Sequence, residues 1–262
     1  MKKTIILGIL LVAALLVSVV VMVVETRPES PHFTQGFPVF DDLPENTYDS
    51  SLFYSENGFI RYADASVGID VSAHQGNIEW QRVKEAGVDF AVIRVGYRGY
   101  TNGGINMDPN FPQNLQGTKA AGLSVGAYFF SQATTETEAI TEALFVLECL
   151  DGAKLDLPVY YDWEPVETEA RTDDVTGEQV TKFAQAFCGA ISDAGYKAGV
   201  YFNESMGYGF LNLHELSAYD FWLAQYLDVP DFYYDFAMWQ YSSSGEVPGI
   251  EHPVDLNLRF IK

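Results

Sequence analysis

The stretch Glu85-Ala-Gly-Val-Asp-Phe-Ala-Val-Ile-Arg-Val-Gly-Tyr97 joins the end of a predicted helix to a predicted strand. Glycine just after a helix favours the left-handed conformation that closes it, and the long apolar run is typical of a strand covered on both faces. The same order of features returns at residues 120–130 and 193–203. This alternation of helix and strand predicts a parallel β-sheet flanked by helices.

Eight such strands are predicted between residues 66 and 262, with less helix among the last three. Eight strands favour a closed (β/α) TIM-like barrel, irregular near its end, over an open doubly wound sheet. Asp108-Pro109 has the form of a helix start within this region. The predicted strands are 68–72, 90–97, 124–130, 157–164, 197–203, 221–226, 236–241 and 254–260.

The first 24 residues predict a membrane anchor. Residues 5–24 are apolar except for Gly8 and Ser18, and as a helix they would span roughly 30 Å, the thickness of a bilayer core. Lysines precede this run and glutamates follow it, which places the remaining chain outside the cell at the cell membrane. The alternative is a cleaved signal peptide, which would make the protein secreted.

Three further regions follow the predicted anchor. Residues 25–50 contain four prolines in a polar stretch without periodicity and are predicted to form an extracellular tether. Residues 51–65 surround Asn57-Gly58, a signal for a β-hairpin that we expect to pack on the following domain. Residues 66–262 form the predicted barrel domain.

Composition excludes several classes of function. The chain has 15 basic and 36 acidic residues, a net charge of −21, so it lacks the basic footprint that nucleic acids require. Its sequence has no phosphate-binding glycine motif, and its four histidines and two cysteines lack metal-ligand spacing. We therefore expect no cofactor and no metal. An oxidising compartment would permit a disulfide between Cys149 and Cys188, but Cys188 lies on the apolar stripe of a predicted helix, which favours free thiols. We also expect a monomer.

Acidic residues at the predicted strand ends are the strongest functional signal. Asp162 and Glu164 lie two residues apart on one strand, so both side chains face one side with Cα atoms roughly 6–7 Å apart. Such a pair can divide the work of glycoside hydrolysis between a protonated acid and an ionised stabiliser. An ordinary acidic strand exit is the alternative interpretation. Asp70 and Asp255 each lie between apolar residues, where an unpartnered carboxylate is costly unless it has a role.

Aromatic side chains near the strand ends could pack against the flat faces of sugar rings. The candidates are Tyr128, Trp163, Trp222 and Trp239.

Several motifs in this region resemble glycoside hydrolase family 25, the Chalaropsis-type lysozymes. They include Gly68-Ile-Asp-Val-Ser72, Pro158-Val-x-x-Asp162-x-Glu164, Trp239-Gln-Tyr241 and Val254-Asp-Leu-Asn257, in the expected order. The resemblance covers residues 66–262. One departure is Phe129-Phe130, because many relatives carry histidine after the tyrosine that matches Tyr128.

The resemblance implies an N-acetylmuramidase on a flattened barrel, which hydrolyses the β-1,4 bond between N-acetylmuramic acid and N-acetylglucosamine in peptidoglycan. Glu164 would be the general acid/base, Asp162 would stabilise the intermediate, and Asp70 and Asp255 would complete the acids. The family's saccharide groove would be lined by Tyr97, Tyr128, Asn203, Gln225, Trp239 and Gln240.

Two other functions remain open on the sequence. One is a non-catalytic peptidoglycan-binding module that uses the same groove. The other is a chitinase-like hydrolase, although Asp156 lies six residues before Asp162 and does not fit that family's DxxDxDxE spacing. If Glu164 acts as an acid among three other acids, their charges should raise its pKa.

Overall fold

The computed structural model describes residues 32–34, 37–39 and 43–261. The chain divides into two compact units, residues 1–40 and 41–262. In the first unit, two short strands pair antiparallel, β1 (His32–Thr34) and β2 (Phe37–Val39). The expected anchor at residues 1–24 lies outside the described residues. In the part of the chain that the structure describes, no helix is both long and apolar enough to cross a membrane.

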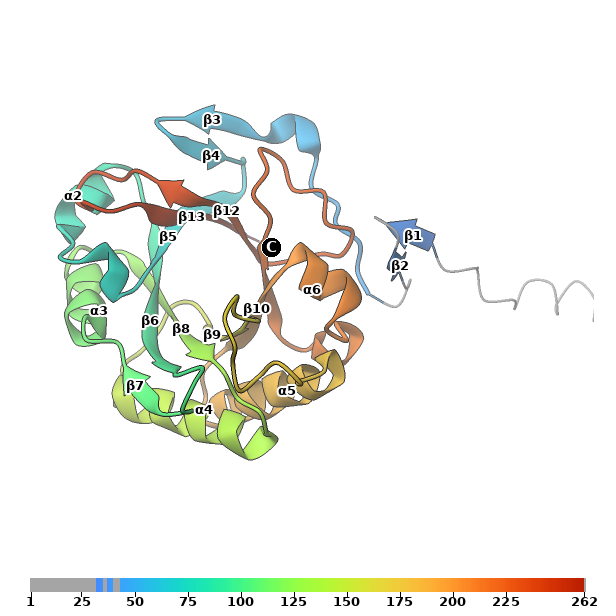
Figure 1. The fold of residues 1–262 in the computed structure, drawn as a ribbon. Coiled ribbons are helices and arrows are strands. Elements are labelled where there is room, and N and C mark those ends of the chain that lie inside the picture. Colours follow the sequence, from blue (N-terminus) through green and yellow to red (C-terminus); the bar gives the residue numbers. More distant parts are fainter. Residues whose placement is uncertain (1–31, 35–36, 40–42, 262) are drawn as a thin grey trace, which may run out of the picture. The chain divides into compact units, whose positions relative to one another are not determined.

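Strands of the second unit close into a barrel, which Figure 1 shows along its axis. They pair in the ring order β5-β6-β8-β9-β10-β11-β12-β13, and β13 returns to pair with β5. The predicted α/β barrel of about eight strands is therefore confirmed. The strands are β5 (Ala65–Val71), β6 (Phe90–Arg98), β8 (Ser124–Ser131), β9 (Val159–Trp163), β10 (Ala198–Asn203), β11 (Asp220–Ala224), β12 (Met238–Gly245) and β13 (Val254–Phe260).

The last strand departs from the expected parallel sheet. Strand β13 runs antiparallel to both β12 and β5, whereas the other neighbours in the ring are parallel. Only residues 246–253 connect β12 to β13, and a crossover between parallel strands needs roughly a dozen residues or more. As a result, the first residues of β13 lie at the same rim as the last residues of the other strands.

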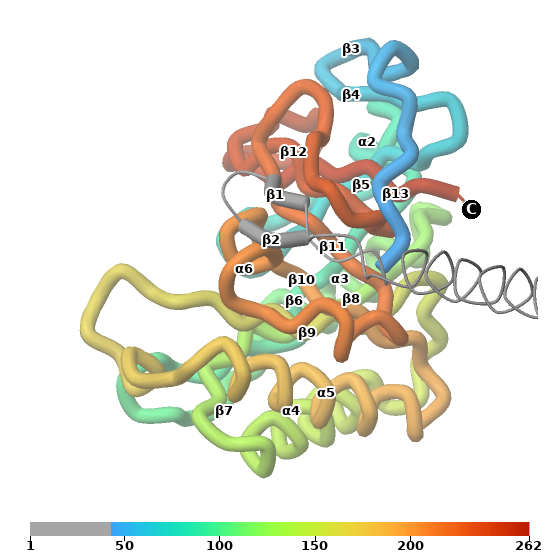
Figure 2. The backbone as a smooth tube through the Cα atoms, turned by 90° about the vertical axis from the view of Figure 1, so that its right-hand side faces the viewer, coloured from blue at the N-terminus to red at the C-terminus, as the bar shows by residue number. Residues whose placement is uncertain are grey.

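Helices cover the barrel from β5 to β10, as Figure 1 shows. Figure 2 shows α4 and α5, the two longest helices in the described part of the chain, running side by side. The expected closing glycines Gly87, Gly122 and Gly195 have φ of 95°, 72° and 88°. The remaining elements are α2 (Trp80–Glu85), α3 (Phe111–Ala120), α4 (Glu136–Leu150), α5 (Gly177–Asp193), α6 (Glu204–Gly209), strand β7 (Ile105–Met107), and the 3-10 turns η1 (Ser50–Leu52), η2 (Ala73–Gln75) and η3 (His214–Leu216).

The segment before the barrel takes the place of helices on the outer face of β12 and β13. The Tyr48 ring stacks on Phe260 with a centroid distance of 3.8 Å, and its hydroxyl donates a hydrogen bond to the Phe236 carbonyl at 2.6 Å. Phe53 meets the Trp239 ring edge-on at 5.8 Å. Residues 43–50, which we expect to belong to the tether at 25–50, therefore pack as part of the domain.

The hairpin predicted around Asn57-Gly58 is present as β3 (Tyr54–Glu56) and β4 (Phe59–Arg61). Both turn residues have positive φ, 53° and 83°, as a type I′ turn requires. Phe59 and Ile60 are buried. The hairpin lies over β12 and β13 in Figure 1.

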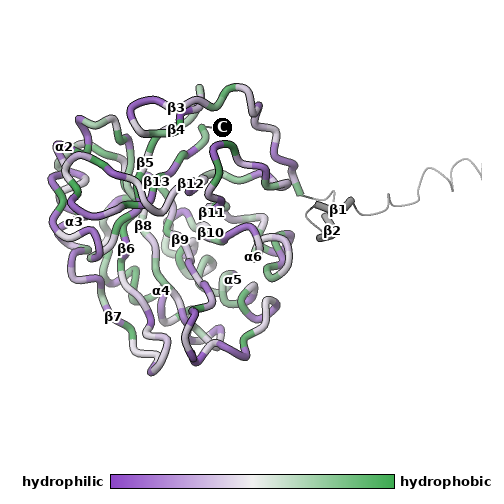
Figure 3. Tube along the Cα trace, turned by 45° about the horizontal axis from the view of Figure 1, so that its top comes forward, coloured by the Kyte–Doolittle hydropathy of each residue, from purple (hydrophilic) through white to green (hydrophobic). Residues whose placement is uncertain are grey.

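Hydrophobic stretches concentrate in the central strands, and hydrophilic ones predominate in the surrounding loops (Figure 3). Close packing inside the barrel depends on glycine at inward positions. A Cβ atom at Gly68 would lie 2.2 Å from the ring of Phe90, and one at Gly199 would lie 2.4 Å from the ring of Tyr160. Each glycine thus makes room for an aromatic ring on a neighbouring strand. Cys149 and Cys188 are free.

Candidate active site

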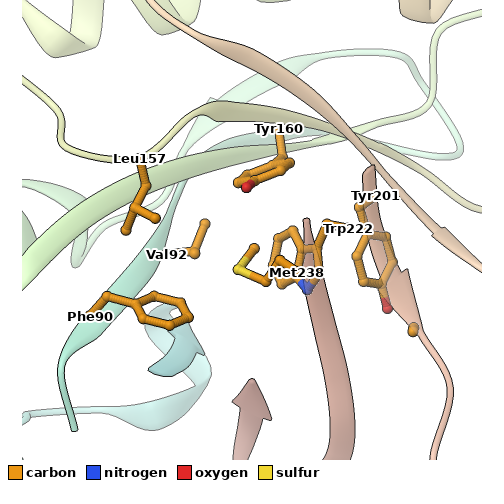
Figure 4. Close-up of a cluster of buried hydrophobic side chains, with 8 residues drawn as sticks. Phe90, Val92, Leu157, Tyr160, Tyr201, Trp222 and Met238 are labelled. Atoms are coloured by element: carbon orange, nitrogen blue, oxygen red, sulfur yellow. The ribbon is translucent and has the colours of Figure 1, made fainter. Parts of the chain in front are cut away.

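Aromatic and apolar side chains fill the interior of the barrel (Figure 4). Alternation along each strand carries these inward positions up to the rim: Tyr160 and Asp162 are two residues apart on β9 and so share a face. The acids at the rim therefore have an apolar floor beneath them. The cluster consists of Phe90, Val92, Leu157, Tyr160, Tyr201, Trp222, Ala224 and Met238, with Tyr128 packed against it.

Asp70 and Asp255 form a pair of acids across two strands. They are direct partners in the antiparallel register of β5 and β13, which places both side chains on one face. Oδ2 of Asp70 accepts hydrogen bonds from Nε2 of Gln240 at 2.9 Å and Nδ2 of Asn257 at 2.8 Å. Burial, and after it the charge of Asp255, raises the pKa of Asp70 well above its usual value. Burial also raises the pKa of Asp255, to about 6.

Asp162 lies on β9 and is more deeply buried than Glu164, which follows that strand. It is 7% exposed, and its Oδ1 is buried with no hydrogen-bond partner among the described residues. Burial and the charges of Glu164 and Asp70 raise its pKa well above the usual value, while Arg94 acts in the opposite direction. The unpartnered oxygen faces a desolvation cost that a donor on a bound substrate would offset.

Arg94 is the cation that counters these acids. Its Nε donates to Oδ2 of Asp108 at 2.8 Å, and Asp108 is fully buried. The same Oδ2 accepts from the backbone N–H of Ala73 at 2.9 Å. Asp108 therefore fixes the guanidinium rather than starting a helix at Asp108-Pro109 as predicted, since α3 begins at Phe111. The sequence already marks Arg94 as unusual, because it is the one charged residue within an apolar strand segment, at an inward position.

Glu164 follows β9 directly and is partly exposed at the rim. Its carbonyl oxygen accepts a hydrogen bond from Nε2 of Gln132 at 2.7 Å, and Oε1 of the buried Gln132 accepts from Oγ1 of Thr172 at 2.9 Å. The pKa of Glu164 is raised to about 6, first by burial and then by the charge of Asp255. The direction agrees with the prediction, but burial is a larger cause than the neighbouring charge.

A cavity of about 450 Å³ opens beside Glu164. The hydroxyls of Tyr201 and Tyr226 both donate to Oε1 of Gln240, at 3.0 and 3.1 Å, and Gln240 in turn donates to Asp70. Sequence reasoning gave neither tyrosine a role, although Tyr201 is two residues before Asn203 on an inward face. The cavity is lined by Glu164, Tyr201, Asn203, Glu204, Ser205, Ala224, Gln225, Tyr226 and Leu227.

Five of the predicted groove residues lie at or near this rim. The guanidinium carbon of Arg94 lies over the Tyr97 ring, 5.4 Å from the ring centroid. Tyr128 points into the barrel, and burial and the charge of Asp70 raise its pKa. Asn203 caps α6 through a hydrogen bond from the Met206 N–H, and the side chain of Gln225 is held by two hydrogen bonds with Asp231. Gln240 is only 4% exposed, and its side chain donates a hydrogen bond to Asp70.

The structure contradicts the expected sugar contacts of two tryptophans. Trp163 is 3% exposed, stacks on Phe210 and donates to the Ala133 carbonyl at 3.1 Å. Trp239 is fully buried outside the barrel and donates to the Gln225 carbonyl at 2.7 Å. Both adjoin inward-facing residues in sequence, so strand alternation turns them outward. Trp222 is also buried, within the interior cluster.

The combination of a closed mixed barrel and four acids at one rim agrees with the comparison to known families. The family model for "Glycosyl hydrolases family 25" matches residues 69–250, well over half of the chain. The chain belongs to glycosyl hydrolase family 25.

Among the residues that the structure describes, no group of three His, Cys, Asp or Glu could hold a metal ion.

Individual relatives are similar over the same region. The chain is 29% identical over 191 residues to the autolytic lysozyme of Clostridium acetobutylicum, covering 72% of this chain but 54% of that protein. The structure of a bacterial lysozyme from Streptomyces coelicolor is 26% identical, with a TM-score of 0.61, covering 75% and 92% of the two chains. The modular autolysin LytC from Streptococcus pneumoniae, in complex with a synthetic peptidoglycan ligand, is 25% identical with a TM-score of 0.65, covering 79% of this chain and 52% of LytC. The chain thus spans about half the length of two of these relatives.

Proposed function

We propose that this chain is an N-acetylmuramidase that hydrolyses the β-1,4 bond between N-acetylmuramic acid and N-acetylglucosamine in peptidoglycan. The observation that carries this proposal is the pairing of a partly exposed Glu164, whose pKa is raised to about 6, with the more deeply buried Asp162 near the end of β9. Family membership and the two similar lysozymes support the choice of reaction. The ligand seen with LytC supports the choice of substrate.

The proposed reaction begins with protonated Glu164, which donates its proton to the glycosidic oxygen as the bond from that oxygen to C1 of the N-acetylmuramic acid breaks. The N-acetylglucosamine end leaves with a new hydroxyl. Positive charge develops at C1 and its ring oxygen, and a negative carboxylate nearby stabilises it. A water molecule then adds to C1 and returns a proton to Glu164, which creates a reducing end.

Asp162 is the group placed to act on the sugar that carries this charge. Its unpartnered Oδ1 can accept a hydrogen bond from the N–H of the substrate's 2-acetamido group, which would orient that group toward C1. Arg94, held by Asp108, favours the ionised form of Asp162. Burial, and after it the charge of Asp255, keeps the proton on Glu164 at mildly acidic pH.

The direct test is the release of new reducing ends from purified peptidoglycan by residues 43–262. Glu164→Gln should reduce the rate by a factor of about 10² to 10⁴, the usual contribution of general acid–base catalysis. Glu167→Gln, an exposed neighbour three residues on, is the matched control and should behave as wild type. Mass spectrometry of the products identifies the bond that is cut. Equal rates for wild type and Glu164→Gln, or wall binding without new reducing ends, would refute the assignment.

We further propose that residues 5–24 hold the enzyme at the cell membrane with the barrel outside. The support is the apolar run itself and the lysines that precede it. In a cell that expresses the full chain, protease added from outside should digest the barrel's accessible loops, and the protein should sediment with membranes. Recovery of the barrel in the culture medium would instead support the cleaved alternative.

A further inference from the structure

A second cavity, of about 590 Å³, lies between the β3–β4 hairpin and the rim of the barrel. One wall comes from the hairpin, the opposite wall from the loop after β11, and the floor from β12 and β13. The proposed cleavage reaction does not use this cavity. Its lining residues are Ser55, Gly58, Phe59, Ile60, Tyr226, Leu227, Asp228, Tyr241, Ser242, Gly245 and Leu256.

The second cavity adjoins the catalytic one. Tyr226 and Leu227 line both, and these residues are 56% and 44% exposed. The hydroxyl of Tyr226 donates a hydrogen bond to Gln240 at 3.1 Å. A chain-like ligand that passes from the catalytic cavity over these two exposed residues would reach the second cavity.

The hairpin wall is held firmly against the barrel. Phe59 and Ile60 are 3% and 8% exposed, and the Ile60 N–H donates to the hydroxyl of Tyr241 at 3.3 Å. The guanidinium of Arg61 lies over the Phe59 ring at 5.6 Å. All hairpin residues precede the part of the chain that the family model matches, which begins at residue 69.

We propose that this second cavity is an additional saccharide subsite, in which the hairpin binds the glycan strand beyond the bond that is cut. The inference rests on the proposed function. A peptidoglycan glycan strand is a polymer, so it must continue past the catalytic cavity. The lining combines the exposed ring of Tyr226 with small polar groups, Ser55 and Ser242, which suits the apolar faces and hydroxyls of a sugar. The hairpin thus makes this enzyme favour long strands.

The test fills the cavity without touching the catalytic residues. Ser55 is exposed on β3, opposite the buried Ile60, so Ser55→Trp should occupy the space beneath the hairpin while leaving the fold intact. The value of kcat/KM is measured on long glycan strands stripped of peptide and on the shortest oligosaccharide that wild type cleaves. Ser192→Trp, an exposed serine near the end of α5, is the matched control.

The expected result is a loss of roughly tenfold on long strands for Ser55→Trp, with less than a twofold change on the short oligosaccharide and no change for the control. Equal effects on both substrates, or no effect on either, would overturn the subsite. Strands that still carry their peptides serve as a further substrate, and a loss measured on them alone would also overturn the subsite, since the occupant would then be a peptide stem. If wild type cleaves neither substrate, the proposed function itself fails.

Discussion

Replacing Asp255 with asparagine should move the alkaline decline of activity to lower pH. Burial and the charge of Asp255, in that order, raise the pKa of Glu164 from 4.5 to about 6. That difference of about 1.5 pH units corresponds to roughly 2 kcal/mol. Burial persists in the variant and is the larger cause, so the share of Asp255 is below half. We expect the decline to move by about 0.5 unit, since half of the shift would be only about 0.75 unit.

The direction of this pH shift follows from the protonation state in which Glu164 catalyses bond cleavage. Bond cleavage needs the protonated carboxyl, which a raised pKa preserves up to about pH 6. Activity therefore falls as pH rises through that value. Removing the negative charge of Asp255 makes ionisation of Glu164 easier, lowers its pKa and brings the decline to a more acidic pH. Because these acids are close together, the measured values belong to the group as a whole.

The assay measures kcat/KM at each pH from 4 to 9, with the release of new reducing ends as the readout. The shape of the profile is informative even if Asp255→Asn also lowers the maximal rate. Asp193→Asn is the control, because it removes an exposed acid at the end of α5, where the chain leads into the start of β10 at the opposite end of the barrel from the rim. A decline that stays in place or moves to higher pH in Asp255→Asn would refute the reasoning, as would an equal shift in the control.

Three further predictions test the assigned roles. Trp239→Phe should lower Tm by a few degrees, because the hydrogen bond to the Gln225 carbonyl is worth about 1 kcal/mol, and should leave KM unchanged; a raised KM would restore the groove role. Asp108→Asn should lower kcat, because the charge-assisted bond to Arg94 is worth about 1.5–3 kcal/mol; an unchanged kcat in the folded variant would contradict this. Tyr48→Ala should cost about 2 kcal/mol of unfolding free energy, or roughly 4–8 °C in Tm by calorimetry, since it removes a stacked ring; an unaltered Tm would show that the N-terminal segment does not stabilise the barrel.

The barrel strands could be predicted because each combines local signals that agree. Apolar runs bounded by a closing glycine mark the strands after α2, α3 and α5, and tertiary packing has no reason to override them. The direction of β13 has a weaker signal, the short connection at residues 246–253, which matters only when compared with the length of a crossover. The packing of Tyr48 on Phe260 has no local signal, because a proline-rich polar stretch gives no periodicity from which burial could be inferred.

Strand alternation decides which predicted site residues meet. Asp162 points inward, so Trp163 has to point outward, and the same holds for Gln240 and Trp239. Applying this rule to the sequence would have removed both tryptophans from the groove. In the predicted strand 221–226 the same rule puts Tyr226 on the face of Trp222, although β11 itself ends at Ala224.

The arrangement of acids at the rim opposes stability, which supports its role in catalysis. Asp70 and Asp255 are direct cross-strand partners, and like charges in that position destabilise a sheet. Gln240 and Asn257 both donate to Oδ2 of Asp70, while Oδ1 of Asp162 has no hydrogen-bond partner in the described region. A barrel selected for stability alone would place apolar side chains at these inward positions, as it does one layer below. Sites that depart from the pattern of their own fold are where function is expected, and these three acids lie together at the rim beside Glu164.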